Sequence, residues 1–309
     1  MAVNTEEKIK LVIWDLDETF WAGTLSEEGI QVVEENILIV KELAARGVVS
    51  SISSKNDYNS VREKLVELGV WEFFVFPKIE WTSKGENVKQ TITDMGLRAV
   101  NCLFIDDNLT NLAEVEYFCQ GIQSSHPLNI LHDLLGLKST EGKNDVELSR
   151  LAQYKVLEKK QVDKEKSNSS NEDFLRKSNI RIKIDYNIDS SFERILELIE
   201  RTNQLNYTKK RLTSDRDVED FRQKLGGFGY SAACISCADE YGDYGVVGFY
   251  LLKTSFEGKN LEHFVFSCRT MNMGIEQFLY NYLNKPDLNI VEPVAYSFEA
   301  QEGVDWVTV

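Results

Sequence analysis

The chain has 309 residues, enough for about two domains, and 42% of them are hydrophobic, as in an ordinary soluble globular protein. Its net charge of −15 argues against broad binding to nucleic acid or to an anionic membrane, because both need a positive surface field. The N-terminal residues lack the apolar core of a signal peptide, and no apolar run is long enough to span a bilayer. Since the five cysteines are also an odd number, we expect a cytoplasmic protein with reduced thiols.

The first part of the chain alternates short apolar runs with amphipathic segments. Each amphipathic segment carries apolar residues at helical spacing, and most end at a glycine. Such alternation is typical of an α/β fold, a parallel sheet with helices on both faces. We predict strands at 11–14, 48–53, 73–76, 101–105 and 121–124, and helices within 36–47, 56–69, 83–96 and 108–118.

The composition changes after residue 138. Residues 139–178 are highly charged, and we predict a helical linker there between a domain at 1–138 and a domain at 179–309. The second domain is predicted to be α+β with a mainly antiparallel sheet. Its Cys234 and Cys237 form a C-x-x-C, which we interpret as part of a strand because no second pair lies nearby. The predicted strands are 180–184, 230–238, 245–253, 261–268 and 288–296, and the predicted helices are 190–204, 215–225 and 273–283.

Polar side chains follow the predicted strands of the first domain. In an open α/β sheet, ligands bind outside the carboxyl ends of the strands, so we expect these side chains to meet at one point. In chain order they are Asp15, Asp17 and Thr19 after the first strand, Ser54 after the second, Lys84 at the helix after the third, and Asp106, Asp107 and Asn108 after the fourth.

This set suits phosphoryl transfer to an aspartate. One carboxylate can attack phosphorus, and a second, two residues on, can protonate the leaving group and then activate water. Mg²⁺ prefers hard oxygen ligands, and a hydroxyl and a lysine can hold the remaining phosphate oxygens. Taken singly, each residue has a simpler alternative, such as a helix cap or a solvated lysine. Their joint order favours the functional interpretation.

The same motifs resemble those of the haloacid dehalogenase superfamily. "DLDET" at 15–19 matches its first motif, followed by Ser54, Lys84 and the "DD" at 106–107. The resemblance implies that Asp15 is the nucleophile and Asp17 the acid and base. It also implies that Mg²⁺ is bound by Asp15, Asp106 and the backbone carbonyl of Asp17, with Asp107, Asn108 and Thr19 in support. A phosphorelay receiver uses similar residues in another order, and the third predicted strand here ends without an acid.

Many members of this superfamily insert a cap domain over the site. The stretches from Thr19 to the first helix and from Ser54 to Lys84 are too short for one. A site without a cap admits a large substrate or uses another element as its lid. The second domain is the candidate lid.

A further resemblance covers nearly the whole chain. The segments "DLDETFWAGTLSEEG", "SSKND", "SKGENV", "FIDDN", "RTNQLNYTKKRLT", "DEYGDYGVVG" and "SCRTMNMGIEQ" resemble, in this order, the FkbH-like family. The family pairs a capless phosphatase domain with a domain similar to the GNAT acyltransferases, here shortened at its C-terminus. It implies that a glyceryl unit from a phosphorylated three-carbon acid, such as a phosphoglycerate, passes through an enzyme thiol to an acyl carrier protein.

The resemblance also directs attention to the second domain. Ser53 stands where the family commonly has a cysteine, which leaves Cys268, beside Arg269, as the candidate thiol; the alternative is a buried strand thiol. The amides of Asn203, Gln204 and Asn206 could bind substrate or a partner, or could only end a helix. Three hypotheses therefore stand: a phosphatase coupled to acyl transfer, a plain phosphatase whose second domain is a lid or partner-binding module, and a non-catalytic binding module.

Overall fold

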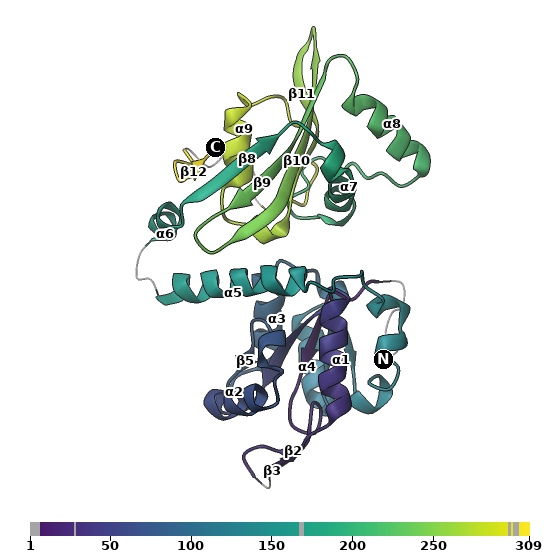
Figure 1. The fold of residues 1–309 in the computed structure, drawn as a ribbon, viewed down its shortest axis with the longest axis vertical. Coiled ribbons are helices and arrows are strands. Elements are labelled where there is room, and N and C mark those ends of the chain that lie inside the picture. Colours follow the sequence, from purple (N-terminus) through teal and green to yellow (C-terminus); the bar gives the residue numbers. More distant parts are fainter. Residues whose placement is uncertain (1–6, 28, 167–169, 296–297, 299–302) are drawn as a thin grey trace. The chain divides into compact units, whose positions relative to one another are not determined.

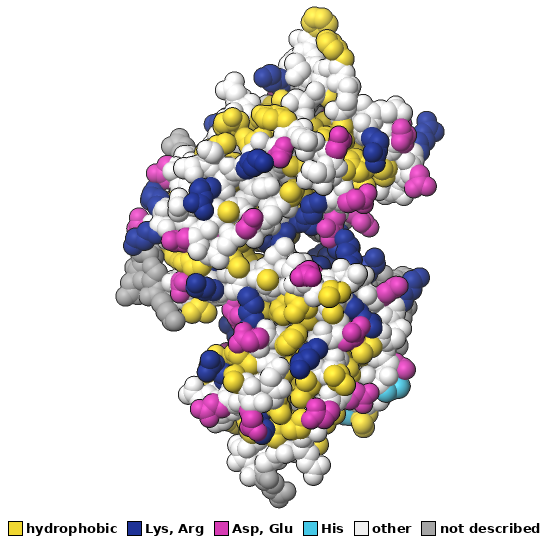
Figure 2. Space-filling model, viewed as in Figure 1, with side chains coloured by type: hydrophobic (Ala, Val, Ile, Leu, Met, Phe, Trp, Pro, Cys, Tyr) yellow, Lys and Arg dark blue, Asp and Glu magenta, His cyan; other side chains and the backbone are white. Residues whose placement is uncertain are grey.

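The computed structural model describes residues 7–27, 29–166, 170–295, 298 and 303–309 (Figure 1). The chain divides into two compact units, Met1–Lys159 and Lys160–Val309, called unit 1 and unit 2 below. On the face drawn in Figure 2, acidic and basic side chains are interspersed. Within the described ranges, no helix has the length and apolar character needed to cross a bilayer.

Unit 1 is built on a five-stranded sheet in the order β5-β4-β1-β6-β7, and every neighbouring pair is parallel. All four residues of the central strand β1 are buried, as expected for a strand covered on both faces. In the register, Trp14 lies opposite Ile52 of β4 and Ile105 of β6, so the chain leaves all three strands at one edge. The strands are β1 (Leu11–Trp14), β4 (Val49–Ser54), β5 (Lys78–Ile79), β6 (Cys102–Ile105) and β7 (Gln123–Ser125).

Helices cover both faces of this sheet, as the sequence predicts. One apolar cluster joins buried residues of α1 (Glu34–Ala45) and α2 (Tyr58–Glu67) to one side of the strands. A second cluster joins α3 (Lys84–Asp94) and α4 (Leu109–Phe118) to the other side. The linker prediction falls partly on α5 (Ser149–Lys166), and its Leu151 and Tyr154 belong to the second cluster.

Two local features of unit 1 differ from the predictions. The strand predicted at 73–76 is wrong: its first residue, Phe73, ends a 3-10 turn that begins at Trp71, and the edge strand is β5. Phe74 makes only an isolated bridge to Ser50. The left-handed backbone of Phe76 (φ 49°) and the missing N–H of the following proline interrupt the ladder there.

The second difference is an antiparallel hairpin, β2 (Ala22–Thr24) with β3 (Gly29–Gln31), which the sequence analysis did not predict. Its glycines allow the fold, because Gly23 has φ 87° and a Cβ there would lie 2.6 Å from the carbonyl oxygen of Gly29. Among the described residues between Thr19 and α1, this hairpin is the one regular element. The described residues of this stretch therefore form no cap domain.

Unit 2 has a second five-stranded sheet, in the order β11-β10-β9-β8-β12. The pairs are antiparallel except β12 with β8, which confirms the prediction of a mainly antiparallel sheet. Cys234 and Cys237 both lie buried in β9, as predicted. The strands are β8 (Ile180–Asp185), β9 (Tyr230–Ala238), β10 (Asp243–Ser255), β11 (Gly258–Phe266) and β12 (Val307–Thr308). The helices are α6 (Asn171–Lys177), α7 (Phe192–Arg201), α8 (Asp215–Leu225) and α9 (Ile275–Tyr282).

The last predicted strand, 288–296, is wrong over its described part, 288–295. This stretch is irregular, although the backbone N–H groups of Val291 and Ala295 donate to the carbonyls of Tyr207 and Gln204. Pro293 has no N–H to give to a ladder, which disfavours a regular strand. Residue 296 lies outside the described residues.

Candidate active site

Three buried side chains meet at the carboxyl edge of the unit 1 sheet. Asp15 follows β1, Asp106 follows β6, and Lys84 is the first residue of α3; their exposed fractions are 6%, 0% and 3%. Lys84 Nζ lies 2.7 Å from Asp15 Oδ1 and 2.6 Å from Asp106 Oδ2. The parallel pairing of β1 with β6 sets the two aspartates side by side, and the Asp15 N–H donates to the carbonyl of Ile105 at 2.9 Å.

A third carboxylate completes an acidic cluster. Oxygens of Asp15, Asp106 and Asp107 all lie within 4.8 Å of one another. Burial, opposed by Lys84 and reinforced by Asp106, raises the pKa of Asp15 to about 6. Burial and Asp106 also raise the pKa of Asp107. Because one ammonium group balances only one of three carboxylates, the cluster favours a further cation.

Asp106 is held by its own loop and helix. Its Oδ1 accepts from the backbone N–H of Asn108 at 2.8 Å, and Asn111 Nδ2 donates to both of its oxygens, at 3.1 and 3.2 Å. The Asn108 side chain caps α4 by accepting from Thr110 N–H, and Thr19 Oγ1 accepts from Asp107 N–H. Sequence reasoning missed Asn111, although its place in the first turn of a helix that starts at this edge was a usable signal.

Asp17 has a different environment. Its Oδ1 accepts from Trp21 Nε1 at 2.8 Å and from Leu25 N–H at 3.2 Å, while its Oδ2 accepts from Asn56 Nδ2 at 2.9 Å. Its carboxylate is therefore not one of the three in the acidic cluster. Asn56 also donates to Ser54 Oγ at 3.2 Å, so it joins two predicted site residues. Asn56 itself is buried, and the sequence analysis did not include it among the site residues.

The residues singled out in unit 2 lie in two segments that the backbone brings together. Tyr207 N–H donates to the carbonyl of Phe264, and Phe266 N–H donates to that of Leu205. Asn206, which lies between Leu205 and Tyr207, is buried, and its side chain accepts from Lys209 N–H.

The other candidates of unit 2 lie around these two segments. Lys209 Nζ donates to the carbonyl of Asn203, and the Gln204 carbonyl accepts from Ala295 N–H. Cys268 and Arg269 follow the second segment in a 3-10 turn, and both are partly exposed. Burial and Arg211 lower the pKa of Lys209, while the nearby Glu292 and Cys268 oppose that shift. These residues therefore form one neighbourhood of unit 2.

No protein-family model matches the chain, and no curated protein matches it. Among solved structures, it is similar to the N-terminal part of a Bacteroides fragilis protein containing a phosphatase domain complexed with Mg (23% identity, 44% of this chain and 40% of that one, TM-score 0.36). It is also similar to the 3-deoxy-D-manno-octulosonate 8-phosphate phosphatase of Moraxella catarrhalis (21% identity, 36% of this chain and 65% of that one, TM-score 0.30). A third similar structure is the cobalt-bound deoxy-D-mannose-octulosonate 8-phosphate phosphatase of Haemophilus influenzae (22% identity, 39% of this chain and 67% of that one, TM-score 0.33). The chain thus spans less than two thirds of the first two structures, and the function proposed below rests on the site itself.

Proposed function

We propose that unit 1 is a Mg²⁺-dependent phosphohydrolase of the haloacid dehalogenase type that forms a phosphoryl intermediate on Asp15. The observation that carries this proposal is the contact of the Lys84 ammonium with Asp15 and Asp106, beside a third carboxylate. A lysine at this position can hold phosphate oxygens while an adjacent carboxylate attacks phosphorus. Small phosphorylated compounds are the proposed substrates.

A divalent cation fits the residues present. Asp15, Asp106 and Asp107 offer clustered carboxylate oxygens, which are hard ligands of the kind Mg²⁺ prefers. Asp15 and Asp106 would hold the ion, as would the backbone carbonyl of Asp17. When bound, Mg²⁺ supplies positive charge that offsets the repulsion between the carboxylates and the phosphate.

The residues of the chain have distinct roles in the proposed reaction. Asp15 attacks phosphorus, and the bond from phosphorus to the leaving oxygen breaks while Asp17 gives that oxygen a proton. Ser54 and Lys84 hold the phosphoryl oxygens. Asp17 then takes a proton from water, which attacks the phosphoryl group and releases inorganic phosphate and the free Asp15 carboxylate. Trp21 and Asn56 fix the direction of the Asp17 carboxylate for both proton transfers.

Phosphate release from p-nitrophenyl phosphate and acetyl phosphate tests the proposal. We expect turnover with Mg²⁺, loss of turnover in EDTA, and loss in Asp15→Asn. Asp133→Asn is the matched control, because that carboxylate is exposed and lies outside the acidic cluster. Full turnover in Asp15→Asn would contradict the proposal, and inactivity of the wild type toward a broad panel of phosphorylated compounds would favour a binding module.

A second candidate function couples dephosphorylation to acyl transfer. Its support is the partly exposed Cys268, which follows the second segment beside Arg269. Cys268 also lies close enough to Lys209 to affect the pKa of that lysine. Nearby cations of this kind favour the thiolate form of a cysteine. In this scheme the Cys268 thiolate attacks the acyl-phosphate carbon of 1,3-bisphosphoglycerate and displaces inorganic phosphate. Unit 1 hydrolyses the remaining phosphate ester, and the glyceryl group then passes to the thiol of an acyl carrier protein, which frees Cys268. Intact mass measurement after incubation with 1,3-bisphosphoglycerate and Mg²⁺ tests it. A glyceryl adduct absent from Cys268→Ser would support the transfer, and phosphate release without an adduct would leave the plain phosphatase.

A further inference from the structure

Large apolar side chains are exposed at the edge of unit 1 that carries the candidate active site. Trp81 follows β5 and is 72% exposed, and Leu109 follows β6 and is 71% exposed. Leu128 follows β7 and is 82% exposed, whereas Tyr58 after β4 packs edge-on against Trp71. Exposed apolar side chains beside a ligand-binding edge are candidates for contact with a ligand or a partner.

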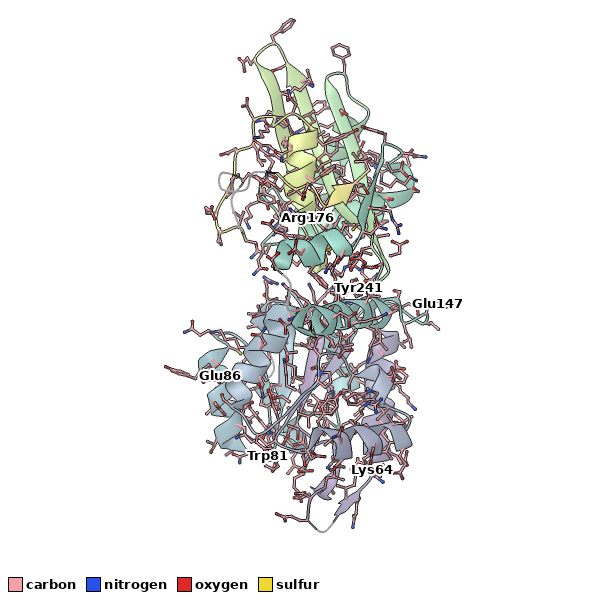
Figure 3. The ribbon with its side chains drawn as sticks, turned by 90° about the vertical axis from the view of Figure 1, so that its left-hand side faces the viewer. Lys64, Trp81, Glu86, Glu147, Arg176 and Tyr241 are labelled. Atoms are coloured by element: carbon pink, nitrogen blue, oxygen red, sulfur yellow. The ribbon has the colours of Figure 1, made fainter. Side chains whose placement is uncertain are left out.

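Trp81 is fixed between two parts of the site. The backbone N–H of its neighbour Glu80 donates to the carbonyl of Ser54 at 3.1 Å. Three residues after Trp81, the Lys84 ammonium contacts Asp15 and Asp106. Figure 3 labels Trp81 at the end of unit 1 where the β2–β3 hairpin lies in Figure 1. Trp81 therefore stands on a short loop whose two ends are tied to site residues, at Glu80 through Ser54 and at Lys84 through the two aspartates.

Leu109 stands on the neighbouring helix of the same face. It is the first residue of α4, three residues after Asp106. The N-terminal part of α3 packs on α4, since Ser83 Oγ donates to Glu114 Oε1 at 2.5 Å. The start of α3 thus packs on the middle of α4, and Trp81 and Leu109 each stand three residues from a site residue, Lys84 and Asp106.

The charges at this edge restrict what can lie beside these side chains. Within the four residues that follow each strand of the five-stranded sheet of unit 1, the exposed acidic residues are Glu18, Asp57 and Glu80, against one exposed lysine, Lys55. A leaving group that carries its own negative charge would be repelled there. An uncharged leaving group with an apolar or aromatic surface gains contact with an indole instead.

We infer that Trp81, with Leu109, is a specificity-determining residue that receives an uncharged leaving group with an apolar or aromatic surface. The inference rests on the proposed phosphohydrolase function, because it assigns the part of the substrate that leaves Asp15. It runs against a phosphoglycerate as the preferred substrate, since that leaving group carries a carboxylate.

The test compares kcat/KM for 1-naphthyl phosphate with kcat/KM for glycerol 2-phosphate, whose leaving group is small and hydrophilic. Trp81→Ala is expected to lower the ratio of the two values by about tenfold, the size of one lost aromatic contact. Trp81→Phe should restore most of the ratio. Phe256→Ala is the matched control, because Phe256 is a fully exposed aromatic residue between β10 and β11 of unit 2.

The outcomes separate the inference from the function on which it rests. Hydrolysis of both esters with an unchanged ratio in Trp81→Ala would overturn the inference and leave the phosphohydrolase standing. If the ratio is unchanged and the wild type is a dimer that Trp81→Ala dissociates, the indole belongs to a subunit contact. That result would also overturn the inference. Hydrolysis of neither ester, nor of acetyl phosphate, by the wild type would contradict both.

Discussion

Lys84 Nζ lies 2.6 Å from Asp106 Oδ2, and both side chains are buried. The contact joins the start of α3 to the end of β6, and the same ammonium contacts Asp15. Lys84 is therefore the cation shared by two strands of the site, and it offsets part of the repulsion among the buried carboxylates.

Replacement of Lys84 by methionine should destabilise the protein as well as stop turnover. The variant keeps the stem of the side chain but leaves two buried carboxylates without their cation, which costs about 3 kcal/mol of unfolding free energy near neutral pH. Urea unfolding measures this loss. Lys89→Met, on the exposed face of the same helix, should leave the free energy nearly unchanged. Equal stability of the two variants would show that the Lys84 contacts contribute little.

Asn56→Ala should impair proton transfer through Asp17. The amide donates to Asp17 Oδ2, so its loss frees the carboxylate to turn away from the leaving oxygen. An alkyl phosphate needs that proton more than p-nitrophenyl phosphate does, because its leaving group is more basic. We expect kcat to fall by about tenfold for the alkyl ester and by less for the aryl ester. An equal fall for both esters would assign Asn56 to a structural role.

Gly85→Ala should disturb the packing that positions Lys84. A Cβ at Gly85 would lie 2.4 Å from a ring carbon of Phe118 and 3.1 Å from the carbonyl oxygen of Glu114. The overlap should cost about 1–3 kcal/mol and displace the start of α3, with a loss of kcat. Thermal unfolding and phosphate release measure the two effects. The double variant with Phe118→Leu removes most of the overlapping ring, so a double variant no better than Gly85→Ala would contradict this account.

These positions show what the sequence could predict and what it could not. Asp15, Ser54, Lys84 and Asp106 follow apolar strands or open a helix, so the rule that ligands bind at the carboxyl edge of the sheet predicts their convergence. Asn111 is different, because its contact with Asp106 depends on the rotation of α4 about its axis.

The two wrong strands have a different cause. Phe74 and Val75 are buried and apolar, but they fill the core beside a chain that bends at Phe76. Apolar composition alone does not distinguish such a turn from a strand. The stretch that ends near Ala295 likewise contains residues typical of strands. The proline within it argues against a regular strand, because it has no N–H to donate to a neighbouring strand.

His263 makes unit 2 sensitive to acid. Burial and Lys210 lower its pKa to about 4, against a smaller opposing effect of Glu262, while its ring packs on Phe221. The unfolded chain binds a proton near the ordinary value of 6.5 and the folded protein does not, so stability is complete above that pH and falls as the pH drops toward 4. Between about pH 7.5 and about pH 5 the loss should be roughly 2 kcal/mol.

The variant His263→Leu should remove that part of the pH dependence. Urea unfolding at the two pH values measures it in the full chain. His132→Leu is the matched control for removal of an imidazole, because that ring is exposed. The account of His263 would be wrong if both variants kept the slope of the wild type.

The most direct test of the central claim is mass spectrometry of the Asp17→Asn variant after acid quench of a reaction with acetyl phosphate and Mg²⁺. Without the Asp17 base, attack of water on the intermediate should slow, and the protein should gain one phosphoryl group. Borohydride reduction and peptide mapping should then place that group on Asp15, and Asp15→Asn/Asp17→Asn should gain none. A phosphoryl group on any other residue, or one that persists in the double variant, would contradict the account.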